Sequence, residues 1–425
     1  MKLDAINNAV LKETVYAGTH PSGLRVYVYH KPEFSSTFAM FGTVYGSVDN
    51  RFKNEGQSDF TEVPEGIAHF LEHKLFENED GDVFSLFAET GASANAYTSF
   101  DRTCYLFSCT EEFDHNMEIL LDFVQSPYFT AETVNKEQGI IGQEIDMYRD
   151  NAGWRVFFNL LAALYENHPV RIDIAGTKGS IAQITPELLY ECHRTFYRLS
   201  NMFVVVAGNA EPEHVAGLIE KNLKPAEPAH VQRDMPAEPE NVYKERFEQR
   251  LPVAQPMFAL GFKERCGTPH KPDRHRVAMR ALLNMLAGPT SDLFVSLLND
   301  GLINDSFSTE YFTAYGCATP VFSGESRDPD GVKAKIIAEI ERVKAEGFDG
   351  ELFENSKKLL YGQAVSGYNN PDDIASALTE CMVMGEGPFD TIDIIGSLTM
   401  EDIGGALEAI NTGHCSLSLV LPAEQ

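Results

Sequence analysis

The sequence predicts an α+β chain of two homologous domains, each a mostly antiparallel sheet flanked by helices. Its 425 residues exceed the size at which one hydrophobic core keeps growing. A proline-rich stretch with few large apolar side chains, residues 221–240, suits an extended linker. The order of strand-like and helical segments before this stretch recurs after it. We therefore predict an N-terminal domain over 1–220, a linker over 221–240 and a C-terminal domain over 241–425.

The elements of the N-terminal half follow from hydrophobic periodicity. Alternating apolar residues over 24–30 and the apolar run 37–47 predict two strands. The segment 68–76 has the pattern of a helix, residues 95–109 read as strand, and residues 116–125 read as a second helix.

The C-terminal half repeats this order with little sequence identity. Residues 255–262 predict a strand, 275–288 a helix, 307–323 a strand-rich piece and 332–348 an amphipathic helix. The shared order indicates an internal duplication of one α+β unit. We expect antiparallel sheets with helices on one face.

Charge and composition exclude several function classes. The net charge of −29 repels nucleic-acid phosphates and anionic membrane surfaces. It indicates a solvated surface or, less favoured, the attraction of a cationic substrate. No stretch reaches the roughly 18 uninterrupted apolar residues of a membrane span, and we expect no export signal in the first residues. The seven scattered cysteines form no C-x-x-C pair, so we expect reduced thiols in a cytoplasmic protein.

The pattern H-x-x-E-H carries the chemistry. His69 and His73 are four residues apart, so a helix places both imidazoles on one face, where they can share a cation. Glu72 shares that face and can act on a water without being a ligand. The alternative is two polar residues on an amphipathic helix. It is less favoured because the apolar neighbours predict a buried helix whose histidines need partners: Ala68, Phe70, Leu71, Leu75 and Phe76.

A catalytic zinc needs a third protein ligand and an open position for water. Glu137 and Glu144 are seven residues apart on a predicted helix and project from the same side. One can bind the metal while the other supports the site from outside the ligand shell. The alternative reading is an ordinary solvated acidic face.

The segment GIAHFLEHKLFE, followed by E-x6-E, resembles the pitrilysin/insulinase family of zinc metallopeptidases. The similarity covers most of the N-terminal half and is closest to bacterial YmfH-like proteins within the mitochondrial-processing-peptidase branch. It implies one zinc per chain held by His69, His73 and Glu144, with Glu72 as the general base and Glu137 supporting catalysis. It also implies an edge strand that binds the substrate backbone: Asn95, Ala96, Tyr97 and Thr98.

One part of the family pattern is missing. Active members have an arginine and a tyrosine in the C-terminal half that hold the substrate and the developing oxyanion. The nearest alignment here places Leu298 and Asn304 at those positions, and Asp292 at an earlier arginine. We therefore expect a homologous partner subunit that supplies these groups. A homodimer and a specialised peptidase that uses other residues stay open.

The predicted function is a zinc-dependent endopeptidase that hydrolyses peptides or unfolded segments. The alternative is a non-catalytic zinc-binding or assembly subunit of a peptidase complex.

Overall fold

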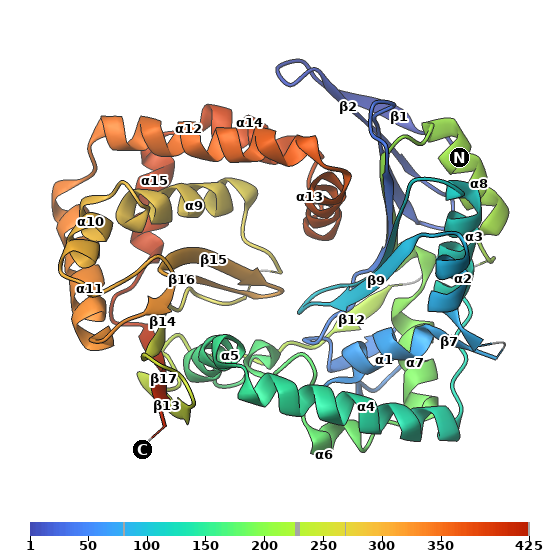
Figure 1. Cartoon of the computed structure of the whole chain (residues 1–425), viewed down its shortest axis with the longest axis horizontal. Coiled ribbons are helices and arrows are strands. Elements are labelled where there is room, and N and C mark those ends of the chain that lie inside the picture. Colours follow the sequence, from blue (N-terminus) through green and yellow to red (C-terminus); the bar gives the residue numbers. More distant parts are fainter. Residues whose placement is uncertain (80, 226–229, 268, 424–425) are drawn as a thin grey trace. The chain divides into compact units, whose positions relative to one another are not determined.

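The computed structural model describes residues 1–79, 81–225, 230–267 and 269–423 (Figure 1). The chain forms two compact units, each built from three segments. The first unit contains Met1–Ile145, Asp173–Asp234 and Val365–Phe389, and the second contains Asp146–Ile172, Met235–Ala364 and Asp390–Gln425.

The first unit is built on a seven-stranded sheet in the order β1-β2-β3-β11-β4-β10-β9. Strands β3 and β11 are parallel, and the other neighbours are antiparallel. The strands are β1 (Asp4–Asn8), β2 (Glu13–Thr19), β3 (Arg25–His30), β4 (Thr37–Thr43), β9 (Ser93–Thr98), β10 (Thr103–Cys109) and β11 (Met202–Gly208). The run 95–109 thus contains two strands joined by a turn.

Helices cover both faces of this sheet. The helices of this unit are α1 (Ile67–Leu75), α2 (Val83–Glu89), α3 (Phe113–Val124), α4 (Ala131–Asp150, up to residue 145), α6 (Lys178–Ile181), α7 (Pro186–Phe196), α8 (Pro212–Asn222) and α13 (Pro371–Met384). In Figure 1, α2, α3 and α8 lie on one side and α13 on the other. Every residue of β4 and β11 is accordingly buried. The expectation of helices on one face is wrong, because a helix from far along the chain covers the second face.

Two hydrogen bonds attach α13 to the sheet. Thr379 Oγ1 lies 3.1 Å from Met40 Sδ, and Arg25 Nη1 donates a 2.5 Å hydrogen bond to the carbonyl of Met382. These contacts join residues more than 300 positions apart in the sequence.

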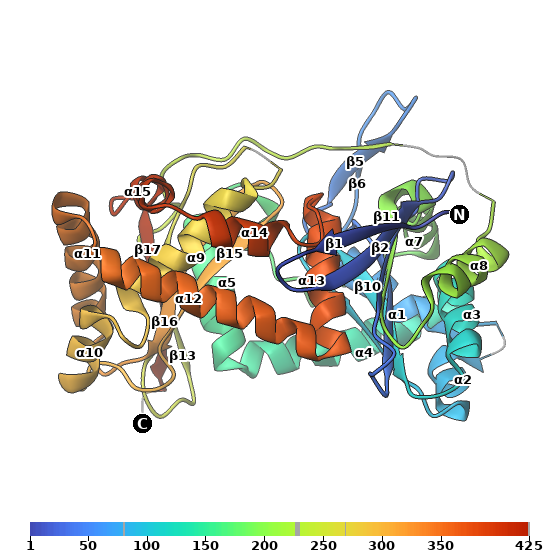
Figure 2. The same ribbon diagram turned by 90° about the horizontal axis from the view of Figure 1, so that it is seen from above.

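A small sheet extends from this unit (Figure 2). It contains β5 (Arg51–Asn54), β6 (Thr61–Glu62) and β12 (Val231–Arg233). The predicted linker therefore carries a strand, and its residues 226–229 lie outside the described residues. Arg233 Nε contacts the buried carboxylate of Asp49 at 2.5 Å and fixes this strand to the unit. A further two-stranded hairpin follows α1, formed by β7 (Glu77–Asn78) and β8 (Gly81–Asp82).

The second unit repeats the topology. Its five-stranded sheet has the order β13-β17-β14-β16-β15, with β13 and β17 parallel and the other neighbours antiparallel. This order matches β3-β11-β4-β10-β9 position by position. The strands are β13 (Arg246–Leu251), β14 (Met257–Phe262), β15 (Ser308–Ala314), β16 (Cys317–Glu325) and β17 (Cys415–Pro422). The two-domain α+β fold is thus confirmed.

The helices of the second unit are α5 (Ala152–Leu164), α9 (Asp273–Ala287), α10 (Asp292–Asn299), α11 (Pro329–Glu346), α12 (Gly350–Ser366), α14 (Asp390–Ser397) and α15 (Met400–Ala409). Helix α5 packs on β14 and β17 of this unit, just as α13 packs on β4 and β11 of the first. Each unit therefore takes one sheet-covering helix from the other half of the chain. The boundaries at 220 and 241 refer to the duplicated sequence and stay a prediction. The two compact units do not follow them, because each unit combines segments from both halves of the chain.

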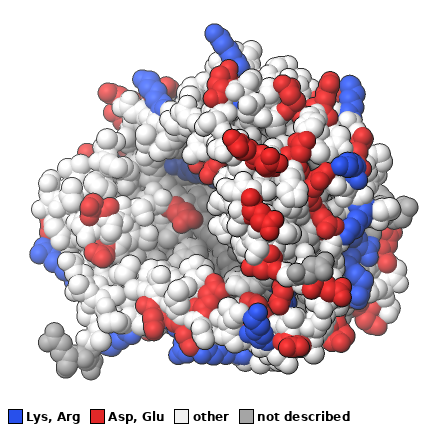
Figure 3. All heavy atoms as spheres, turned by 45° about the vertical axis from the view of Figure 1, so that its right-hand side comes forward, with Lys and Arg blue, Asp and Glu red and all other residues white. Residues whose placement is uncertain are grey.

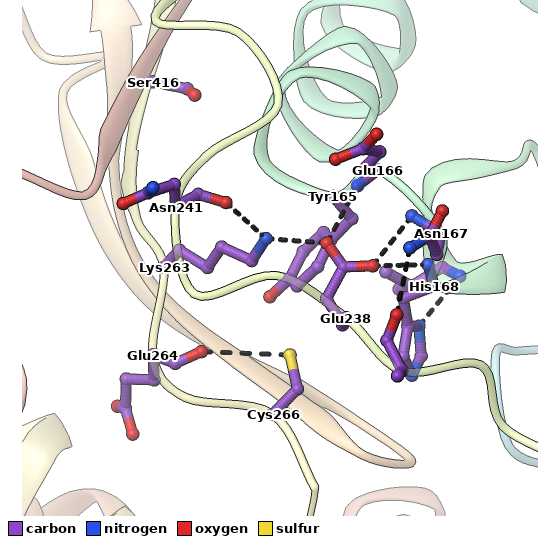
Figure 4. A network of polar contacts seen from close by, with 12 residues as sticks. Tyr165, Glu166, Asn167, His168, Glu238, Asn241, Lys263, Glu264, Cys266 and Ser416 are labelled. Atoms are coloured by element: carbon purple, nitrogen blue, oxygen red, sulfur yellow. Dashed lines mark hydrogen bonds and ion pairs between the residues drawn. The ribbon is translucent and has the colours of Figure 1, made fainter.

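A buried ion pair anchors the chain just after β12 (Figure 4). Glu238 Oε1 lies 2.6 Å from Lys263 Nζ, and both side chains are 1% exposed. The Glu238 carboxylate also accepts the backbone N–H groups of residues 166–168 at 2.7–2.8 Å. Burial alone would raise the pKa of Glu238, but Lys263 and these N–H groups lower it overall.

The surface is predominantly acidic. Figure 3 shows many more red Asp and Glu side chains than blue Lys and Arg side chains on the face in view. The seven cysteines all lie in the described part of the chain, and none is bonded to another. No single described helix is long and apolar enough to cross a membrane. The bent pair α9–α10 is together long and apolar enough for a membrane span, but its apolar side chains form much of the second unit's core.

Candidate metal centre

Helix α1 carries the H-x-x-E-H pattern and begins at a close approach of two chain segments. Gly66 caps its N-terminus with φ +87°, and a Cβ there would lie 2.5 Å from the carbonyl oxygen of Ala175. Gly176 has φ +70°, and its Cβ would lie 2.6 Å from the carbonyl oxygen of Glu65. Only glycine fits both positions without strain. The two glycines hold the start of α1 against the segment before α6.

The structure brings both histidines together with Glu144. His69 and His73 have ring centroids 4.6 Å apart. His69 Nε2 lies 3.6 Å from Glu144 Oε1, and His73 Nε2 lies 3.5 Å from Glu144 Oε2. One ligand atom from each of the three residues falls within 4.8 Å of the others. Helix α4 supplies Glu144, so two helices meet at this point.

Glu137, two turns before Glu144 on α4, faces the other nitrogen of His73. Its Oε1 lies 3.0 Å from His73 Nδ1. A carboxylate at Nδ1 orients the imidazole and leaves Nε2 to bind a metal. Spacing in the sequence did not say which of the two glutamates binds the metal. In the structure, Glu144 faces Nε2 of both histidines and Glu137 faces Nδ1 of His73.

These residues fit a zinc ion. Two ligands of a tetrahedral zinc lie roughly 3.3–3.5 Å apart, close to the separations of Glu144 from both imidazoles. Three carboxylates, Glu72, Glu137 and Glu144, surround two imidazoles that are buried or half-buried. Burial would lower the pKa of His73, but the Glu137 hydrogen bond and the three negative charges raise it overall. A cation would neutralise this excess of negative charge.

Glu72 is held by the edge strand of the sheet. Thr98 Oγ1 of β9 donates a 2.7 Å hydrogen bond to Glu72 Oε2, and the carboxyl group is buried. Among the described strands, β9 pairs with β10 alone, in the register Thr103↔Thr98, and ends the sheet on that side. Its outer N–H and C=O groups can therefore pair with an extended peptide.

Of the other three residues predicted on this strand, Ala96 and Tyr97 are half-buried and Asn95 is not. Asn95 is exposed, and its Oδ1 accepts from the N–H of Ala96. Tyr97 turns to the opposite face from Thr98, where its hydroxyl contacts Met40 Sδ at 3.9 Å. Burial raises the pKa of Tyr97. Its side chain therefore belongs to the packing of the sheet.

A cavity of about 920 Å³ opens beside these groups. It is lined by Glu72, His73 and Glu137 from the centre, by Asn95 and Ala96 of β9, and by residues of the β7–β8 hairpin and of α4. Its volume is in the range of ligand-binding pockets.

Sequence patterns did not single out a lysine next to the motif. Lys74 is completely buried, and its ammonium group pairs with Glu77 of β7. Because an unpaired buried charge is costly, this pair fixes the hairpin to α1 at the edge of the cavity. The signal in the sequence was a lysine directly after the H-x-x-E-H pattern, in a helix predicted to be buried.

In the second unit, Leu298 has no polar group, and the side chain of Asn304 is hydrogen-bonded to its neighbours. Leu298 lies on α10 with 46% of its surface exposed. Asn304 donates to Glu325 Oε2 at 2.9 Å and accepts from the N–H of Ser306 at 2.9 Å. Asp292 begins α10. The side chain of Asn304 is thus engaged in a local turn.

Two other histidines have structural contacts. His168 Nδ1 accepts the N–H of Val170, and His193 Nε2 lies 3.0 Å from the carbonyl oxygen of Val124. Burial lowers the pKa of each to about 4, so both are neutral at physiological pH.

Two family models match the chain. One, described as insulinase (peptidase family M16), matches residues 58–178, and the other, described as peptidase M16 inactive domain, matches residues 183–360. The uncharacterized zinc protease YmfH of Bacillus subtilis (strain 168) is 40% identical over 97% of both chains.

Two further relatives agree with these matches. A Schizosaccharomyces pombe protein, named for the beta subunit of the mitochondrial-processing peptidase, is 30% identical over 52% of this chain and 47% of its own. The crystal structure of an M16-like peptidase from Alicyclobacillus acidocaldarius matches with a TM-score of 0.92 and 36% identity, covering 100% of this chain and 99% of that one.

Proposed function

Because the chain belongs to the insulinase family of peptidases (peptidase family M16), we propose that it is a zinc-dependent endopeptidase acting on peptides or unfolded segments. The observation that carries the proposal is the position of Glu144, whose two carboxylate oxygens face one imidazole nitrogen each of His69 and His73. Glu72 lies on the same helix face without a metal-ligand position of its own. This arrangement suits a metal site that keeps room for water.

In this proposal His69, His73 and Glu144 hold one zinc per chain. These three residues would hold the metal, which when bound would supply a water of pKa roughly 7 and a Lewis acid for the peptide carbonyl. Glu72 takes the proton from the attacking water and delivers it to the nitrogen of the leaving amine. Glu137 keeps the ring of His73 in position throughout.

Strand β9 positions the substrate. An extended peptide added to its outer edge runs beside the carboxylate that Thr98 holds. The same strand then fixes both the substrate backbone and the general base. A peptide bond of the substrate that lies one residue further along β9 would be displaced from Glu72.

The test compares the zinc-loaded chain with Glu72→Gln on a library of unstructured peptides, with cleavage followed by mass spectrometry. We expect the variant to keep its zinc and fold while hydrolysis falls by about 10²–10⁴-fold. Equal rates in both proteins would show that Glu72 is not the base, and would remove the proposal in this form.

We further propose that full activity needs a homologous partner subunit. Leu298 has no polar group, and Asn304 is engaged with Glu325 and Ser306, so neither stabilises an oxyanion. A missing donor of this kind slows catalysis by about 10²–10³-fold. Co-purification from native lysate, followed by cleavage assays with and without the recovered chain, tests this. Full activity of the lone chain would contradict it.

The alternative is a non-catalytic zinc-binding subunit. The match of residues 183–360 to the family model described as an M16 inactive domain is the observation that favours it. A chain that binds zinc but cuts no peptide, alone or with every recovered partner, would favour this alternative.

A further inference from the structure

A second threonine lies behind the hydrogen bond that holds Glu72. We propose that Thr103 of β10 is a positioning residue for Glu72 and acts through the hydroxyl group of Thr98. The inference rests on the peptidase function proposed above, because it concerns the orientation of the proposed general base. Thr103 is completely buried and lies outside the set of residues that line the cavity. It therefore reaches Glu72 only through another side chain.

Strand pairing brings the two hydroxyl groups together. Thr98 is the last residue of β9 and Thr103 the first of β10, and the two are register partners. Side chains of such a pair stand on the same face of the sheet, with Cβ atoms roughly 4.5–5.5 Å apart. Their Oγ1 atoms accordingly lie 3.3 Å apart. The N–H of Ser99 donates to the carbonyl of Arg102 at 2.8 Å, which closes the turn and fixes this register.

The available protons give these contacts a direction. An ionised carboxylate only accepts hydrogen bonds, so the single hydroxyl proton of Thr98 points to Glu72 Oε2 at 2.7 Å. Thr98 Oγ1 can then only accept from Thr103. Thr103 shares its own proton with the carbonyl oxygen of Tyr45, which lies 2.9 Å away. The two hydroxyl groups thus form a chain from Tyr45 to Glu72 that fixes the rotation of the Thr98 hydroxyl.

The far end of this chain is a fixed point of the first unit. The side chain of Tyr45 is completely buried and stacks on Phe196, with ring centroids 4.0 Å apart. The next residue, Gly46, donates its N–H to the buried carboxylate of Asp49 at 2.9 Å. The carbonyl of Tyr45 is therefore held on both sides, and Thr103 connects the chain to it.

The experiment compares two buried threonines that face each other in the sheet. Thr103→Val removes the hydroxyl and nearly keeps the shape of the side chain, whereas Thr103→Ser keeps the hydroxyl. Thr43→Val is the matched control, because Thr43 is the register partner of Thr103 on β4 and is equally buried. Its hydroxyl donates to the carbonyl of Phe196 at 2.6 Å. Both valine variants thus lose one buried hydrogen bond to a backbone carbonyl.

We measure kcat, KM and zinc content on a cleaved peptide, with any co-purifying homologous subunit added to every arm. Thr103→Val should lower kcat about three- to fivefold at unchanged KM and zinc content, because Glu72 spends less time in its productive orientation. Thr103→Ser should recover most of this loss, and Thr43→Val should leave kcat nearly unchanged. Equal losses in Thr103→Val and Thr43→Val, or no recovery in Thr103→Ser, would overturn the inference and leave the peptidase function standing.

A double variant tests the route from Thr103 to Glu72. Thr98→Val alone is expected to lower kcat about tenfold. If Thr103 acts through Thr98, adding Thr103→Val should lower kcat no further, whereas independent effects would multiply to about 30–50-fold. A multiplied loss would show that Thr103 affects catalysis by another route.

Crystal structures of the zinc-loaded wild type, Thr103→Val and Thr43→Val test the inference where no peptide is cut. Wild type and Thr43→Val should show one rotamer of Thr98, with Oγ1 within about 3 Å of Glu72 Oε2. Thr103→Val should show a second rotamer of Thr98 or a displaced Glu72 carboxylate. An unchanged Thr98 and Glu72 in that variant would overturn the inference. The expected rearrangement without any cleavage would support the hydroxyl chain and contradict the peptidase function alone.

Discussion

Thr98 Oγ1 donates a 2.7 Å hydrogen bond to Glu72 Oε2, so the edge strand of the first sheet holds the carboxylate of the H-x-x-E-H helix. The strand proposed to bind the substrate is thereby hydrogen-bonded directly to the proposed base. Glu72 needs no separate loop to orient it.

Replacing Thr98 by valine removes this hydrogen bond with little change of volume. We expect kcat to fall about tenfold, because one hydrogen bond to a charged group is lost, while zinc content stays the same. Thr98→Ser keeps the hydroxyl and should retain most of the activity. An unchanged kcat in Thr98→Val would mean that Glu72 is oriented by other contacts.

Zinc content tests the ligand set directly. Purified wild-type chain should contain about one zinc per chain by elemental analysis, and His73→Ala should contain less than about a tenth of that, because two ligands bind zinc far more weakly than three. His214→Ala is the matched control, since His214 is exposed on α8 and pairs with Asp114 at 2.7 Å. Equal zinc in wild type and His73→Ala would refute the assignment.

Glu137→Gln separates support from ligation. The amide can still contact His73 Nδ1, but the negative charge is gone. We expect zinc affinity to fall by about 10–100-fold, as is usual when a metal-binding histidine loses its carboxylate partner. Competition with a chelator measures this. Glu144→Gln should have a larger effect, and the reverse order would exchange the roles of the two glutamates.

The pair Glu238–Lys263 predicts a strong effect on stability. Glu238→Gln leaves a buried ammonium group without a counter-ion and should destabilise the second unit by about 3–5 kcal/mol. The single tryptophan, Trp154 on α5, reports unfolding of this unit by fluorescence. Glu240→Gln, whose carboxylate pairs with Arg265 on the surface, should cost about 0.5 kcal/mol or less. Similar losses of stability in both variants would show that the buried pair contributes no more than the surface pair.

The stability that the Glu238–Lys263 pair contributes should also depend on pH. The pKa of Glu238 is lower in the folded state than in the unfolded chain, so this contribution is present above the usual pKa of 4.5. The contribution is lost as pH falls through the lowered folded value. In Glu238→Gln this part of the acid-induced loss should be absent.

His193 predicts a second pH dependence, in the first unit. Burial, reinforced by the charges of Lys224 and Arg194, lowers its pKa from 6.5 to about 4. Below pH 6.5 the unfolded chain binds a proton that the folded chain does not, so stability should fall between pH 6.5 and 4 and level off below. Denaturation followed by circular dichroism should show a shallower slope for His193→Gln. An identical slope would assign the dependence to other groups.

Sequence alone determined the features that local geometry fixes. The spacing of His69 and His73 places them on one helix face wherever that helix packs, because a turn of helix has 3.6 residues. The recurring order of strands and helices likewise predicted two similar sheets, and the two matching strand orders agree with it.

Tertiary structure decided the features that depend on contacts between distant segments. It placed Glu144 against both imidazole Nε2 atoms and Glu137 against His73 Nδ1, although spacing along α4 makes the two glutamates equivalent. It also laid α13 on the first sheet and α5 on the second, because amphipathicity says which face of a helix is buried but not which sheet buries it. The bond from Thr98 to Glu72 arises in the same way, since strand pairing brings together side chains that no local pattern in the sequence connects.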